Sequence, residues 1–114
     1  AVGDAQVTTI AAHNMARAYG AKTLNPELRP AWNVEQVSGP YAGSVLAEYD
    51  HGAPAIPTDN TPPNDDFDTH EDTRRAWDAQ EQMANFFATG MVDHFCEGQC
   101  LCAEGNCDDP DAVE

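Results

Sequence analysis

Four cysteines within a span of twelve residues are the part of this sequence in which residue type and spacing most clearly indicate chemistry. They follow the pattern C-x3-C-x-C-x4-C, and His94 precedes the first of them by two residues. This spacing differs from the paired C-x2-C of zinc ribbons, from iron–sulfur runs and from the C-x2-C-H of haem attachment. The four residues are Cys96, Cys100, Cys102 and Cys107.

One interpretation is that the four cysteines bind a metal, either zinc or a small iron–sulfur cluster. Ligands so close in sequence can converge on one ion without help from a distant core. The local charge opposes this interpretation, because residues 93–114 contain seven acidic side chains and no Lys or Arg. Nearby carboxylates raise the pKa of a thiol and so disfavour the thiolate that binds metal.

A second interpretation, which we prefer, is that the four cysteines form two local disulfides in one of three connectivities. Gly98 and Gly105 would ease the tight loops. Each short loop would contribute about 2–3 kcal/mol in the chain-entropy model. Disulfides would indicate a virion component or an exported protein, whereas bound metal would indicate the cytoplasm. A third interpretation leaves the thiols free and inert.

The remaining candidate residues form no catalytic motif. The four histidines, at positions 13, 51, 70 and 94, include no H-x3-H or H-E-x2-H pair, and only His94 lies near other candidate ligands. His13 falls opposite the apolar stripe of its predicted helix, where we expect it to be solvated. The sequence contains no G-x-S-x-G elbow, Gly-rich phosphate loop or S-x2-K pair. We therefore expect neither an enzyme acting alone nor a cofactor beyond the zinc or iron–sulfur cluster considered above.

The charge balance and the hydropathy pattern exclude two classes of protein. Twenty Asp and Glu face five Lys and Arg, which gives a net charge of −15 at pH 7. Nucleic-acid sites need clustered cations, so we expect no nucleic-acid partner. Nothing in the sequence approaches the ~18 uninterrupted apolar residues of a membrane span, so we expect no membrane insertion.

Two segments have the apolar periodicity of amphipathic helices. Residues 5–19 follow Asp4, a candidate N-cap, and precede Gly20, which suits the C′ position. Residues 69–97 begin with Thr69, a candidate cap, and contain Gly90, which is expected to bend or end the helix. The apolar stripes consist of Val7, Ile10, Ala11, Met15 and Ala18 in the first segment, and of Trp77, Ala84, Phe87, Ala88, Met91 and Phe95 in the second.

The segment between these helices contains seven of the eight prolines and reads as an extended arm or linker, within which runs 32–37 and 44–49 could be short strands or helices. The predicted fold class is therefore mainly α with long irregular segments. Two amphipathic helices, about 5–19 and 69–97, are joined by a Pro-rich arm and followed by a Cys-rich knot. As a single small domain of residues 1–114, the chain divides into an N-terminal helix (1–20), the arm (21–68), the main helix (69–97), the cysteine cluster (96–107) and an acidic tail (108–114).

The scarcity of large apolar residues indicates that the chain needs additional stabilisation. Val, Ile, Leu and Phe make up only 17 of 114 residues, and such chains are commonly held together by disulfides, a metal, self-association or a partner. We therefore hypothesise a non-enzymatic structural or accessory subunit that packs onto protein partners, or onto copies of itself, in a virion or multi-subunit complex. The alternatives are a small metal-binding or redox module and an exported, disulfide-stapled binding protein. Trp32, Tyr41 and Tyr49 would either fill the core or anchor the arm on a neighbour.

Overall fold

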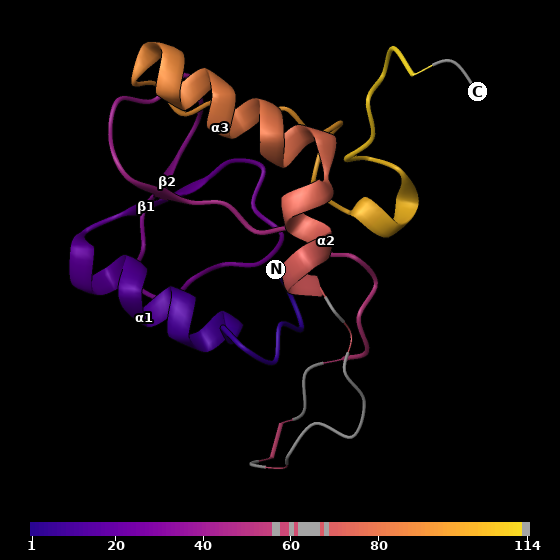
Figure 1. Ribbon diagram of the computed structural model, residues 1–114. Helices are drawn as coiled ribbons and strands as arrows, with labels where there is room; N and C mark the ends of the chain where they lie inside the picture. The colour runs from indigo at the N-terminus through magenta and orange to yellow at the C-terminus, as the bar shows by residue number, and fades with distance from the viewer. Residues whose placement is uncertain (56–57, 60, 62–66, 68, 113–114) are drawn as a thin grey trace.

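Figure 1 shows the computed structural model of the protein, which describes residues 1–55, 58–59, 61, 67 and 69–112. Its elements are α1 (Thr9–Tyr19), β1 (Lys22–Leu24), β2 (Gln36–Val37), β3 (Val45–Leu46), α2 (Thr69–Arg75), α3 (Trp77–Thr89) and a 3-10 turn, η1 (Cys102–Glu104). The prediction of a mainly α fold with two helices is wrong, because the described part contains three α-helices and a three-stranded parallel sheet. In Figure 1, α1 and α3 lie on opposite sides of the strands, and the C-terminal segment lies beside α2.

The sheet lies in the segment that the sequence predicts to be an extended arm. β1 is the central strand and pairs in parallel with β2 on one side and β3 on the other. β2 and β3 fall in the two runs left open between strand and helix, whereas β1 is too short to show an alternating pattern. The prediction of an extended arm is therefore wrong for residues 22–46. Of the rest of the predicted arm, residues 56–57, 60, 62–66 and 68 lie outside the described residues.

α1 begins later than predicted and ends where predicted. Its N-cap is Thr8, whose Oγ1 accepts a hydrogen bond from the Ala11 N–H at 3.4 Å. Asp4 instead accepts two backbone N–H groups in the turn that precedes the helix. Gly20 ends the helix with φ of 68°, a left-handed conformation that glycine adopts without steric cost.

The inward face of α1 is small and polar, opposite to the predicted apolar stripe. Ala16 is buried, and His13, with 14 % of its side chain exposed, donates from Nε2 to Glu48 at 2.8 Å. The stripe faces outward, with Ile10 71 % and Met15 52 % exposed. The prediction that His13 is solvated is therefore wrong. Small residues let α1 approach β3 closely, and the Glu48 carboxylate satisfies the imidazole there.

The predicted helix over 69–97 is divided into α2 and α3. Ala76, between them, has an extended conformation with ψ of 129°, and Gly90 ends α3 with φ of 72°. Thr69 is the first residue of α2 and not its cap, and its Oγ1 has no hydrogen-bond partner among the described residues. α3 turns Asp78 inward and leaves Phe87, a member of the predicted stripe, 83 % exposed. Ala84 and Ala88 of the predicted stripe are exposed as well, whereas Trp77 is half-buried, and Met91 and Phe95 are half-buried and lie beyond the end of α3.

The main cluster of buried residues is built on cysteine side chains, whereas few large aliphatic residues, among them Leu24 and Val92, are buried. Two isolated backbone bridges, Tyr41 with Val92 and Asp50 with Leu101, join the segment after α3 to the segments around β3. These bridges bring the C-terminal cysteines against Tyr49 and the first turn of α3. We call the resulting buried cluster the cysteine core; it consists of Tyr49, Ala79, Cys96, Cys100 and Cys107.

Candidate functional site

Backbone hydrogen bonds from two distant parts of the chain position the four cysteines. Asp50 donates its N–H to the Cys100 carbonyl at 2.9 Å and accepts the Cys102 N–H at 2.7 Å. The first turn of α3 holds the other end of the segment, where the Asp78 N–H donates to the Cys107 carbonyl at 3.4 Å. The cysteines are therefore held by the segment after β3 and by α3, in addition to their own covalent bonds.

The structure pairs the cysteines as Cys96–Cys100 and Cys102–Cys107, which is one of the three connectivities left open by the sequence. The two disulfides are in contact, because the Sγ atoms of Cys96 and Cys107 lie 4.0 Å apart. Cys107 is 2 % exposed and Cys100 3 % exposed, whereas Cys102 is half-buried. Cys96, Cys100 and Cys107 therefore form one buried cluster, with Cys102 at its edge.

A buried carboxylate lies against this cluster. Asp78 is 1 % exposed, and its Oδ2 has no hydrogen-bond partner within the described part of the chain. An oxygen of Asp78 and the sulfurs of Cys96 and Cys107 all lie within 4.8 Å of one another. Burial raises the pKa of the Asp78 carboxyl, with Asp108 adding to the effect and His94 opposing it. Such an unsatisfied buried oxygen is costly unless a proton or a cation compensates it.

Tyr49 is the aromatic member of the cysteine core. Tyr49 is 4 % exposed, and burial, together with the charge of Asp78, raises the pKa of its phenol. Its ring thus stays neutral across the ordinary pH range and serves as apolar filling. Of the three aromatics considered for the arm, Tyr49 fills the core, whereas Trp32 is 79 % exposed and lies under the Arg17 guanidinium at 5.6 Å.

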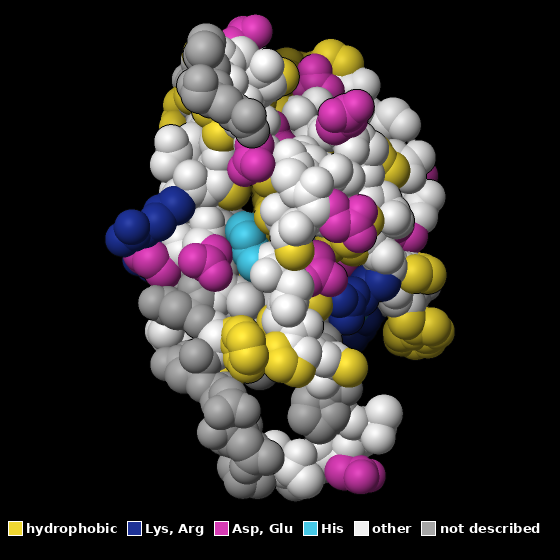
Figure 2. All heavy atoms as spheres, turned by 90° about the vertical axis from the view of Figure 1, so that its right-hand side faces the viewer, with side chains coloured by type: hydrophobic (Ala, Val, Ile, Leu, Met, Phe, Trp, Pro, Cys, Tyr) yellow, Lys and Arg dark blue, Asp and Glu magenta, His cyan; other side chains and the backbone are white. Residues whose placement is uncertain are grey.

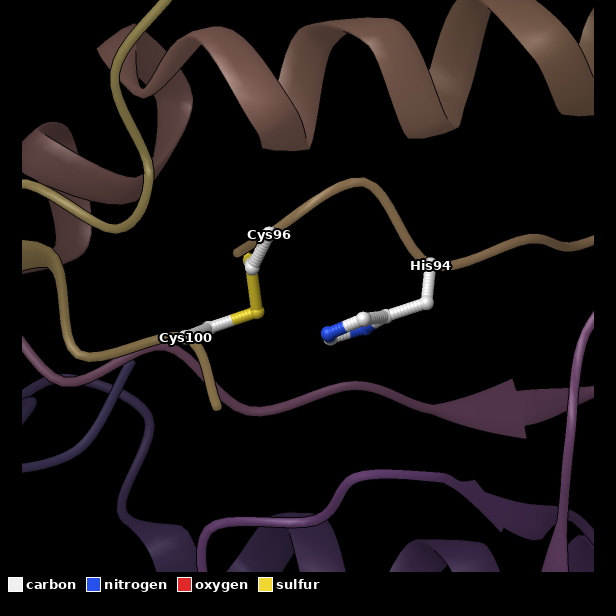
Figure 3. A group of neighbouring side chains, drawn as sticks. All are labelled: His94, Cys96 and Cys100. Carbon is white, nitrogen blue, oxygen red and sulfur yellow. A yellow bond between two sulfur atoms is a disulfide. The ribbon is translucent and has the colours of Figure 1, made fainter. Parts of the chain in front are cut away.

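His94 lies beside the first disulfide, on the strand-like segment that follows α3. Figure 3 shows its ring directed toward the sulfurs of Cys96 and Cys100. A ring nitrogen of His94 and these two sulfurs lie within 4.8 Å of one another, and Nε2 donates to the Gly98 carbonyl. His94 is the only histidine that lies near other candidate ligands in the sequence, and the structure places it beside the cysteines.

The other three histidines each contact a polar partner. His70 on α2 donates from Nδ1 to the Asp4 carboxylate at 2.7 Å, and its Nε2 lies 2.8 Å from the Arg74 guanidinium. Asp4 is 6 % exposed. Burial alone would raise the pKa of the Asp4 carboxyl, but hydrogen bonds from the Val7 N–H, the His70 ring and the Gln6 N–H outweigh it and lower the pKa. This contact ties the N-terminal turn to α2.

The outward side of α3 carries a cluster of large apolar side chains. We call Met83, Phe86 and Phe87 the α3 apolar face; the two phenylalanines follow Met83 by three and four residues, and the three side chains are 48 %, 42 % and 83 % exposed. Their surroundings on the helix are free of charge, because residues 82–92 contain no Asp, Glu, Lys or Arg. Figure 2 shows Asp and Glu side chains scattered over one face of the molecule, where Lys, Arg and apolar side chains are also visible.

The arrangement defines a small α/β protein with a disulfide-linked interior and an apolar outer face. The chain matches no family model, no curated protein and no solved structure. In the part of the chain that the structure describes, no helix combines the length and apolar character needed to cross a membrane.

Sequence reasoning missed Asp78 and Tyr49 as members of the cysteine region. Asp78 has the position of an ordinary acidic residue in the first turn of a helix, where the helix dipole favours it. Nothing in the local pattern distinguishes it from Asp72, which is exposed in α2. One signal was present: Asp78 and Ala79 are small or polar residues away from the predicted apolar stripe of the helix. It indicates a buried position only if the apolar side chains of the helix face outward.

Proposed function

We propose that the protein is a non-enzymatic accessory subunit that docks onto a larger protein assembly through the α3 apolar face. The observation that carries this proposal is the reversed polarity of α3, with polar side chains inward and large apolar side chains outward. On the inward side, Gln82 donates to the Asp93 carbonyl at 2.9 Å and Asn85 donates to the Met91 carbonyl at 3.0 Å. A contiguous exposed apolar patch of this kind is typical of an interaction site.

The side chains of the α3 apolar face are of the type that anchors protein interfaces. The rings of Phe86 and Phe87 lie with their centroids 6.0 Å apart and tilted by 58°. Aromatic rings bury a large apolar area at low cost in side-chain entropy, and interface anchors are enriched in aromatic residues. Moving them onto a partner removes from water the apolar surface that the fold itself leaves exposed.

The charge of the chain favours a different protein over a second copy of this one as the partner. Two copies would bring together bodies that each carry a net charge of −15. A partner with an apolar groove bordered by Lys and Arg would match both the uncharged α3 apolar face and the acidic surface around it. Such complementarity also accelerates association at low ionic strength.

A second outward surface would let the subunit contact two neighbours. The predicted stripe of α1 faces outward, with Ile10 and Met15 more than half exposed. Figure 1 places α1 and α3 on opposite sides of the strands. A subunit with apolar surfaces on opposite sides suits a position between two components of an assembly.

The test is the size of the particle that contains the chain in an extract of its native cells. We expect the tagged wild-type chain to sediment in a large complex, and the F86S/F87S variant to sediment as the free chain. Phe67→Ser is the matched control, because Phe67 is 45 % exposed, close to the 42 % of Phe86, but lies outside both α1 and α3, and it should sediment with the wild type. A free wild-type chain, or an F86S/F87S variant that remains in the complex, would overturn the proposal.

A further inference from the structure

Three potential metal-ligating side chains converge in and beside the cysteine core, and the disulfides do not account for the carboxylate among them. Asp78, Cys96 and Cys107 come from α3, from the segment after it and from the C-terminal loop. Their donor atoms lie within 4.8 Å of one another, and all three residues are buried. Asp78 Oδ2 has no partner among the described residues, although a buried carboxylate oxygen normally accepts hydrogen bonds or binds a cation.

The spacing of the sulfurs matches that of two ligands on one tetrahedral ion. Sulfurs bound to zinc at ~2.3 Å in a tetrahedral site lie about 3.8 Å apart. The Sγ atoms of Cys96 and Cys107, which belong to different disulfides, lie 4.0 Å apart. Two thiolates and a carboxylate form a donor set that suits Zn²⁺, and Cys100 lies next to Cys96 as a fourth donor.

We propose that reduction of the two disulfides converts the cysteine core into a Zn²⁺ site formed by Asp78, Cys96 and Cys107, with Cys100 completing the tetrahedron. Each disulfide is reduced by one dithiol, which transfers two electrons and two protons and becomes a cyclic disulfide. Zn²⁺ then replaces the protons of the ligating thiols, which pass to solvent. Cys102 lies outside the proposed ligand set.

Non-covalent contacts hold the ligands in place when the disulfides open. Hydrogen bonds that do not involve sulfur join Asp50 to the backbone of Cys100 and Cys102 and the Asp78 N–H to the Cys107 carbonyl, and we expect them to persist in the reduced chain. A ring nitrogen of His94 lies within 4.8 Å of the sulfurs of Cys96 and Cys100 (Figure 3), and the ring packs beside this pair. The site therefore does not require the chain to refold before the ion binds.

The experiment measures Zn²⁺ uptake by the full chain before and after reduction. The protein is reduced with a phosphine, freed of reductant under nitrogen and titrated with Zn²⁺, with excess Mg²⁺ present to occupy the surface carboxylates. We expect one tightly bound Zn²⁺ per reduced chain and none in the oxidised chain. Co²⁺ in place of Zn²⁺ should give the absorbance of thiolate ligation.

Three variants distinguish this site from diffuse binding. Asp78→Asn and Cys107→Ser should each weaken Zn²⁺ binding by tenfold or more, whereas Cys102→Ser, the matched control, should bind like the reduced wild type. Cys107→Ser removes a disulfide and could therefore weaken the fold itself. Asp78→Asn keeps both disulfides, and a cooperative thermal transition of the oxidised variant will show that it is folded. Absence of Zn²⁺ uptake by the reduced wild type, or undiminished uptake by both Asp78→Asn and Cys107→Ser, would overturn the proposal.

Discussion

The cysteine core and the α3 apolar face lie on opposite sides of one helix and differ in what fills them. The core side of α3 offers Asp78 and Ala79 to two disulfides and one tyrosine ring. The outer side carries two phenylalanines and a methionine in contact with water. Large apolar side chains normally occupy the interior, where burial of each contributes about 1.5–3 kcal/mol. In this protein disulfides link the interior, and the large apolar side chains of the α3 apolar face remain exposed.

We expect the stability of the fold to depend on residues of the cysteine core and hardly at all on the exposed apolar residues of α3. The largest effect is expected from Tyr49→Ala, because Tyr49 is the largest side chain of the cysteine core and is 4 % exposed. Truncating a buried aromatic residue leaves a cavity and typically costs about 3–5 kcal/mol. Urea unfolding should show this loss with the slope of the transition unchanged. A loss below about 1 kcal/mol would show that the core does not depend on Tyr49.

Reduction of the two disulfides is expected to have the next largest effect when a chelator removes metal. The bonds close loops between residues four and five positions apart. Loops of this size contribute about 2 kcal/mol each in the chain-entropy model, so reduction should cost about 4 kcal/mol in total. The C102S/C107S variant, which lacks one bond, should lose about half as much. Equal stability of reduced and oxidised protein would remove the disulfides from the explanation of how this small core holds together.

Replacement of Asp4 by Asn tests the contact that ties the N-terminal turn to α2. At pH 7 the Asp4 carboxylate accepts hydrogen bonds from two backbone N–H groups and His70, and the variant should be about 1–2 kcal/mol less stable. The pKa of Asp4 is lowered in the folded protein, so its contribution is present above the unfolded value of about 3.9 and is lost as pH falls through the folded value.

The difference between wild type and Asp4→Asn should therefore shrink as the pH is lowered from 7 to 3, as measured by urea unfolding at each pH. Asp59→Asn, at an exposed position, is the control and should change stability little at either pH. A difference that stays constant with pH would show that the Asp4 carboxylate is not the group that titrates.

The sequence was sufficient for the features that a single turn or a local spacing determines. Gly20 and Gly90 mark helix ends, and the clustering of the cysteines already indicates that they act together. It was insufficient for β1, because three residues carry no periodicity, and for the break at Ala76, which has no proline or glycine to mark it. The apolar periodicity was real in both helices. The assumption that the apolar side of each helix faces inward was wrong. An apolar side faces inward only when the helix buries it against the core of its own chain.

The smallest effect is expected from Phe87→Ala, and it is the most informative about the outer surface. Phe87 is 83 % exposed, so its truncation removes few intramolecular contacts and should change the free energy of unfolding by less than about 0.5 kcal/mol. The same substitution in a core would cost about 3–5 kcal/mol. Thermal and urea unfolding of the purified variant measure the difference. A loss of several kcal/mol would mean that Phe87 is packed within its own chain in solution, and the α3 apolar face would then be part of the fold and unavailable to a partner.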